Sequence, residues 1–174
     1  GHLDVVKYLV EKCGQADKFR LHLALARAAE EGHLDVVKYL EENCGRVDEF
    51  RLHHSLDLAA MKGHLDVVKY LVEKCGPADE FRLHGALDRA AGEGHLDVVK
   101  YLVENCEQAD EAGLHQALRL AAEGGYLDVV KYLVEKCGQA DEAGLHQGLR
   151  LAAEGGYLDV VKYLVEKCGQ ADEA

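Results

Sequence analysis

Proline, long apolar runs and positive charge are all scarce in this sequence of 174 residues. It has one proline and no low-complexity tract, which argues against a disordered chain or a flexible linker between domains. No run is long and apolar enough to cross a bilayer, and the first residues lack the basic-then-apolar pattern of a signal peptide. The composition is that of a folded, soluble protein.

Acidic residues outnumber basic ones by 32 to 20, and the formal net charge is −12. Nucleic acids and anionic membranes attract positively charged surfaces. We therefore expect neither a nucleic acid nor a membrane as a partner. An acidic surface favours neutral or basic protein partners but does not identify one.

What the sequence has in abundance is internal repetition. The stretch from Gly63 to Cys75 recurs in near-copies spaced 31 residues apart, beginning at Gly1, Gly32, Gly94, Gly125 and Gly156. A fixed period of about 20 to 50 residues is typical of a solenoid. We therefore predict a single repeat array over residues 1–174. Its repeats are 1–31, 32–62, 63–93, 94–124 and 125–155, with a partial repeat at 156–174.

Each copy of this stretch has the pattern of a short amphipathic helix, which we call the B helix. Between Leu65 and Cys75 the apolar residues are spaced so that they form one stripe. Asp66 lies in the first turn and Lys74 in the last, where each charge suits the helix dipole. Gly76 follows at the position where a left-handed residue would end the helix. Such a short helix is marginal alone, so neighbouring helices must pack against it.

A second helix, the A helix, is predicted from Lys18 to Glu31 and at the equivalent residues of the later copies. Its constant residues, such as Leu21, Leu25, Ala28 and Ala29, fall on one helical face. The positions that vary among the copies fall on the opposite face. A Gly-His or Gly-Tyr pair follows, in which glycine supplies a positive φ for an abrupt turn into the B helix. The repeat is thus predicted to have a constant inside and a variable outside.

The start of the A helix divides the copies into two groups. The first three have Phe-Arg, at residues 19–20, 50–51 and 81–82, whereas the last two have Ala-Gly, at 112–113 and 143–144. Because glycine is a poor helix former, we expect shorter A helices in the last two copies. The phenylalanines either lie on the variable face beside the arginines or cover the loop beneath them.

The run from Ala90 to Glu104, Ala-Ala-x-x-Gly-His-Leu-Asp-Val-Val-Lys-Tyr-Leu-Val-Glu, strongly resembles an ankyrin repeat. The other half of the unit departs from that family. It lacks the Thr-Pro-Leu-His opening and the Gly-Ala-Asp-Val-Asn run that leads into the β-hairpin finger, and the unit is two residues shorter than the family's period. The resemblance implies an all-α solenoid of stacked helix-turn-helix, ankyrin-like repeats, with little or no β-hairpin finger.

The resemblance also implies a non-catalytic scaffold, without a cofactor, that binds another protein through the concave surface formed by the A helices. The candidate residues either vary among the copies or lie at the start of the A helix, before the variable positions. They are Phe19, Arg20, Phe50, Arg51, His54, Asp57, Phe81, Arg82, Asp88, Arg89, Gln116, Arg119, Gln147 and Arg150. Aromatic and arginine side chains are typical of binding hot spots. The alternative is that these positions vary because nothing constrains a solvated face.

The six cysteines occupy one equivalent position per repeat. Equivalent residues of stacked helices lie about 10 Å apart, whereas a disulfide needs Cα atoms within about 7 Å. We therefore expect free thiols and an intracellular, cytoplasmic protein. Two columns of histidines recur in the same way, so their members cannot converge on one metal ion. Near-identical repeats also do not bring dissimilar groups together in a cleft, and we expect neither a metal site nor an enzyme.

Both ends of the sequence carry a B helix, and residues 125–143 recur letter for letter at 156–174. Solenoids normally end in polar caps, which are not evident here. A longer array, end-to-end stacking of copies and an engineered array all remain open. Self-association through the ends is therefore our alternative function, and we expect polar substitution of Val160, Leu164 and Val165 to abolish it.

Overall fold

The computed structural model describes residues 2–13, 18–43, 49–75, 80–105, 111–137 and 142–171. Over these residues it contains eleven helices and no strand, which confirms the all-α prediction. The B helices are α1 (Leu3–Cys13), α3 (Leu34–Asn43), α5 (Leu65–Cys75), α7 (Leu96–Asn105), α9 (Leu127–Cys137) and α11 (Leu158–Ala171). The A helices are α2 (Lys18–Glu30), α4 (Glu49–Met61), α6 (Glu80–Gly92), α8 (Glu111–Gly124) and α10 (Glu142–Gly155).

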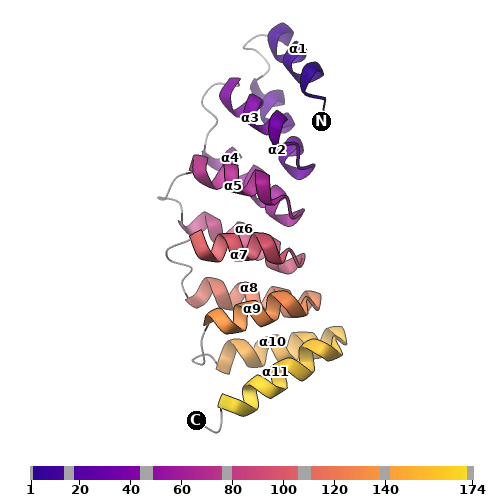
Figure 1. Cartoon of the computed structure of the whole chain (residues 1–174), viewed down its shortest axis with the longest axis vertical. Helices are drawn as coiled ribbons and strands as arrows, with labels where there is room; N and C mark the ends of the chain where they lie inside the picture. Colours follow the sequence, from indigo (N-terminus) through magenta and orange to yellow (C-terminus); the bar gives the residue numbers. More distant parts are fainter. Residues whose placement is uncertain are drawn as a thin grey trace.

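The helices form a solenoid of two layers, with α1 at one end of the long axis and α11 at the other (Figure 1). Each A helix packs against the B helix that follows it and against the A helices of adjacent repeats. The A helices contact one another much more extensively than the B helices do. The A layer therefore supplies most of the packing between repeats.

The described helix boundaries agree with the sequence prediction to within one residue, except near the C-terminus. Helix α5 runs from Leu65 to Cys75 as predicted, whereas the position of Gly76 lies outside the described residues. Helix α11 continues through Gly169 to Ala171, so Gly169 does not end this copy of the B helix. Glycine after the cysteine is therefore not sufficient to stop the helix in the last copy.

The prediction of shorter A helices in the last two copies is wrong. Helices α8 and α10 each have 14 residues, whereas α6 has 13, and all three begin at the equivalent glutamate. Gly113 and Gly144, which were expected to fray the helix start, are both buried. Tertiary packing therefore outweighs the low helix propensity of glycine at these sites.

The turn between the A and B helices has the glycine geometry that the sequence predicts. Gly63 has a φ of 74°. Its N–H donates to the carbonyl of Ala60 at 3.2 Å, and the N–H of His64 donates to that of Ala59 at 2.9 Å. This pair of bonds is a Schellman motif, which satisfies carbonyls that the end of the A helix leaves unpaired. The four equivalent glycines also have positive φ, between 73° and 79°.

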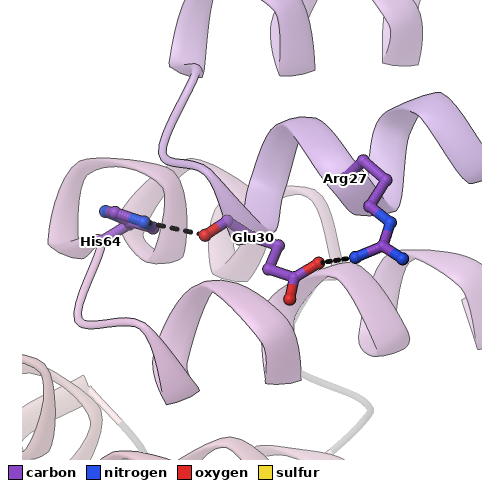
Figure 2. A network of polar contacts seen from close by, with 3 residues as sticks. All are labelled: Arg27, Glu30 and His64. Atoms are coloured by element: carbon purple, nitrogen blue, oxygen red, sulfur yellow. Dashed lines mark hydrogen bonds and ion pairs between the residues drawn. The ribbon is translucent and has the colours of Figure 1, made fainter.

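The same turn joins each repeat to the previous one. The Nε2–H of His64 donates to the carbonyl of Glu30 at 2.9 Å, so it caps the end of α2, as Figure 2 shows beside the ion pair of Glu30 with Arg27. His95 bonds to the carbonyl of Met61 in the same way, at 2.9 Å. A Cβ on Gly32 would lie 2.6 Å from the His64 ring. Glycine here supplies both the backbone conformation and the space for the next repeat's ring.

Where tyrosine replaces the turn histidine, a second glycine accompanies it. A Cβ on Gly94 or on Gly124 would lie 2.3 Å from the ring of Tyr126. The larger ring thus needs space both in the previous turn and in its own. This requirement explains why Gly124 stands at the position that Glu93 occupies in the preceding repeat.

Lysine and tyrosine side chains link successive B helices on the other layer. Lys38 lies 5.5 Å from the ring centroid of Tyr70, and equivalent pairs recur along the array. The hydroxyl of Tyr70 donates to Glu41 at 2.8 Å, and Lys74 pairs with the same carboxylate at 3.1 Å. Burial and then the Glu41 carboxylate raise the pKa of Tyr70 to about 12.

Candidate functional site

The constant positions of the A helix form the core of the array. Leu25, Leu56, Leu87 and Leu118 are at most 2% exposed. The alanine pairs that follow them are buried as well, as at Ala59 and Ala60. These small side chains allow the close approach of neighbouring A helices, and the repeats share one continuous core.

Most of the variable positions lie outside this core. The exposed candidates are His54, Arg89, Gln147 and Arg150. The half-buried candidates are Asp57, Asp88, Gln116 and Arg119. One variable position departs from the prediction, because Ala26, the first member of the column that continues with Asp57, is only 8% exposed.

The start of the A helix supplies one clear surface candidate. Phe50 is 72% exposed, so its side chain lies open to solvent in this copy. Its neighbour Arg51 is half-buried and lies against the ring of His22 on the preceding A helix, with Nη1 facing Nδ1. Arg51 therefore contributes to packing between repeats. The side chains of the four other candidates of this kind, Phe19, Arg20, Phe81 and Arg82, lie outside the described residues.

A column of charges runs along the middle of the A layer. Asp57, Asp88, Arg119 and Arg150 occupy equivalent positions on α4, α6, α8 and α10, so the column changes sign halfway along. Arg150 is exposed and pairs with Glu154 at 3.1 Å. The variable face thus offers acidic groups in its centre and basic groups towards the C-terminus.

The two aspartates are held in an unfavourable environment for a negative charge. Burial raises the pKa of Asp88 to about 6, although His84, Arg119 and Arg89 lower it, and repulsion from Asp57 raises it further. Burial likewise raises the pKa of Asp57, against the attraction of Arg89, His54 and His53. Desolvation therefore outweighs the nearby positive charges at both sites.

Hydrogen bonding in this column is incomplete. Oδ1 of Asp57, Oδ1 of Asp88 and Nε of Arg119 are buried without a hydrogen-bond partner among the described residues. Gly85, on α6, leaves space beside the first of these atoms, because a Cβ there would lie 3.3 Å from Asp57 Oδ1. Buried polar atoms without partners lower stability. These three atoms are therefore expected to destabilise the fold.

Sequence reasoning did not include Leu23 among the candidates, although it is 54% exposed on α2. The signal was present, because Leu23 begins the variable column that continues with His54. The column placed Leu23 on the variable face, but only its later members were chosen as candidates. Its position in the column, rather than its hydrophobicity, indicated its exposure.

Neither a metal site nor a membrane span is found in the described part of the chain. No group of three or more His, Cys, Asp or Glu side chains there could hold a metal ion. Within the same residues, no helix is sufficiently long and apolar to cross a membrane. Among the described cysteines, Cys75, Cys137 and Cys168 are not joined in disulfides.

Stacked two-helix units with a buried constant face and a variable face define an α-helical repeat protein. A family model for ankyrin repeats, which spans three copies, matches residues 43–112 and 87–173. The chain therefore belongs to the ankyrin-repeat family, as its turn sequence indicated. A search of the curated proteins finds no match. Members of the family generally mediate protein–protein interactions and are typically non-catalytic.

Proposed function

We propose that this chain is a non-catalytic scaffold that binds another protein through the variable face of its A helices. The binding residues in this proposal are the candidates predicted from the sequence, a list that begins with Phe19 and ends with Arg150. The described side chains best placed for contact are Phe50, His54, Arg89 and Arg150, because each is exposed. Leu23 joins them on the same grounds.

The observation that supports this proposal is the contrast between the two faces of one helix. On α4, Leu56 and Ala60 are fully buried, whereas Phe50 and His54 are exposed. Surface residues can therefore change from repeat to repeat without disturbing the frame. Exposed aromatic and arginine side chains on a rigid frame are the usual components of a binding hot spot.

The experiment compares partner capture by the wild-type chain and by a variant with Phe50, His54, Arg89 and Arg150 replaced by alanine. A matched control replaces Glu73 and Lys162, which are exposed on the B layer, with alanine. Partners are identified by mass spectrometry and then titrated as purified proteins. We expect the A-layer variant to weaken binding at least tenfold and the control to leave it unchanged. Equal binding by both variants and the wild type would exclude this face.

Self-association through the ends is a second candidate function, favoured by the surface of α11. Leu158 is 61% exposed and Val165 is 54% exposed, while the equivalent residues of α9, Leu127 and Val134, are half-buried by the next repeat. A second copy that covers this surface would bury the same side chains.

The structure changes the test of self-association. Val160 and Leu164 are at most 1% exposed, so polar substitution there would disrupt the fold itself rather than an end contact. The suitable variant replaces Leu158 and Val165 with glutamine. We expect the molar mass in light scattering to rise with concentration for the wild type and to stay constant for this variant. A wild-type mass that is independent of concentration contradicts end-to-end association.

We also propose an intracellular, cytoplasmic location, without nucleic-acid or membrane partners. The cysteines recur once per 31-residue repeat. This spacing is unsuited to disulfides between neighbouring repeats, so it supports reduced thiols and a reducing compartment. The net charge of −12 argues against polyanionic partners. Maleimide labelling of the protein in intact cells, without prior reduction, should modify these thiols. Disulfide-linked cysteines in the isolated protein would contradict the proposed location.

A further inference from the structure

The outer face of helix α4 carries apolar side chains at three positions. Phe50, Leu58 and Met61 lie at offsets of zero, eight and eleven, which places them on one side of the helix. Phe50 is 72% exposed, and Leu58 and Met61 are half-buried. In each other A helix, at least one of the three equivalent positions carries a charged residue. We call Phe50, Leu58 and Met61 the α4 stripe.

The exposure of the α4 stripe is not an effect of the ends of the array. Helix α4 packs between α2 and α6, so it has neighbours in the A layer on both sides (Figure 1). On the inner face of the same helix, Leu52 and Leu56 are buried in the core. Exposed groups of apolar side chains on a folded protein often mark an interaction surface, and methionine adapts its shape to different partners.

Two carboxyl groups border the α4 stripe. Asp57 directly precedes Leu58, and Asp88 occupies the equivalent position on α6. The carboxyl of Asp57 leans towards α6, because its Oδ1 lies 3.3 Å from where a Cβ on Gly85 would lie. Both aspartates are half-buried, so each keeps part of its surface open to a partner. The stripe is therefore adjoined by negative charge on its α6 side.

The arginines of this region do not complete the hydrogen bonding of the two carboxyls. The charges of Arg89 and Arg119 lower the pKa of Asp88, but burial outweighs them. Oδ1 of Asp57 and Oδ1 of Asp88 have no hydrogen-bond donor among the described residues. A further cation beside these carboxyls would offset part of the desolvation that burial imposes on them.

The charges favour one kind of occupant over others. An acidic or neutral partner would cover the two carboxyls and leave them buried without a counter-charge, which is unfavourable. A second copy of the chain carries the same net charge of −12 and would be repelled. A partner that brings a cation together with apolar side chains matches both parts of the surface.

We propose that the α4 stripe, with Asp57 and Asp88, binds a segment of a partner protein in which a lysine or arginine lies among apolar residues. This inference rests on the function proposed above and specifies the chemistry of the partner. The apolar residues of the segment cover the α4 stripe, and its cation bonds to the two carboxylates. Binding is thus concentrated on α4 and α6 rather than spread evenly along the A layer.

The probe for this proposal is a phage-displayed library of random peptides, selected against the whole chain. We expect the enriched sequences to combine lysine or arginine with aromatic or aliphatic residues. An enriched peptide, synthesised with a fluorophore, should bind saturably in fluorescence anisotropy and more weakly as the salt concentration rises. The same peptide with glutamine in place of its basic residues should bind about tenfold more weakly. Enrichment of acidic sequences, equal binding of the glutamine peptide, or no saturable binding up to about 1 mM peptide would overturn the proposal.

Two double variants of the chain locate the bound peptide. Phe50→Ser with Met61→Gln removes apolar surface from the α4 stripe, and Asp57→Asn with Asp88→Asn removes the two negative charges. Each double variant should weaken binding by about tenfold. Both should retain the helical circular dichroism, because all four residues are exposed or half-buried.

The matched control is Glu123→Gln with Glu154→Gln. These exposed residues occupy the position of Met61 on α8 and α10, and their replacement removes the same number of negative charges from the A layer. The control should leave binding unchanged. A loss confined to the control, or binding that all three double variants leave unchanged, would place the peptide elsewhere and overturn this inference. The capture experiment with whole partner proteins tests the broader proposed function separately.

Discussion

Replacement of Asp88 by asparagine is expected to stabilise the chain at neutral pH and to leave its stability unchanged at pH 4. Burial raises the pKa of this carboxyl from 3.8 to about 6 in the folded chain. Between these values the folded chain holds a proton that the unfolded chain releases, so the free energy of unfolding falls as the pH rises through this window. Above it, the ionised carboxylate destabilises the fold fully.

The size of the effect follows from the pKa difference. A difference of about 2 pH units corresponds to about 3 kcal/mol at about 1.4 kcal/mol per unit. Asp88 is only partly buried, so solvent screening reduces this to about 1–2 kcal/mol. For a chain of this length, about 1 kcal/mol changes Tm by roughly 2–4 °C. Asp88→Asn should therefore raise Tm by roughly 2–8 °C at pH 7.5.

The assay is thermal and urea unfolding followed by circular dichroism at pH 7.5 and at pH 4, on the wild type and the variant. Glu123→Gln, an exposed site on the adjacent A helix, is the matched control and should change stability by less than about 0.5 kcal/mol at both pH values. If Asp88→Asn is no more stable than the wild type at pH 7.5, or if the gain is the same at both pH values, desolvation of Asp88 is not the cause.

Three further predictions test the frame by urea unfolding. Gly63→Ala should lower the free energy of unfolding by about 2–3 kcal/mol, and Gly156→Ala by about 1–2 kcal/mol. A Cβ at Gly63 would lie 2.5 Å from the ring of the next repeat's histidine, whereas nothing lies within 4 Å of a Cβ at Gly156. Equal losses would mean that the ring contact contributes nothing. Leu56→Ala should cost about 2–5 kcal/mol because it opens a cavity, whereas Leu158→Ala, at a site 61% exposed, should cost under about 1; similar costs would contradict the assigned core. Tyr70→Phe should reduce the loss of stability between pH 10 and 12, since a pKa raised to about 12 makes the folded chain resist ionisation there, and an unchanged alkaline profile would refute this.

The candidate surface was only partly predictable from the sequence. The variable columns identified His54, Arg89, Gln147 and Arg150 as surface residues, and all four are exposed. They could not show that Arg51 packs against His22, because that contact joins two repeats. They also placed Ala26 on an open face, although the structure buries it.

The sequence by itself determined the repeat, the two helices of each unit and the turn between them. These features follow from spacing along one segment, so the period, the apolar stripe and the turn glycine were sufficient. Helix α5 accordingly has its predicted ends at Leu65 and Cys75.

Only the tertiary structure decided how each repeat depends on its neighbours. The ring of Tyr126 requires space at both Gly94 and Gly124, and Val5 is exposed although the same residue type is buried one repeat later. Helical periodicity assigns a side chain to a face but does not specify what lies against it. Burial depends on contacts between helices of different repeats, and the sequence of a single repeat does not specify those contacts.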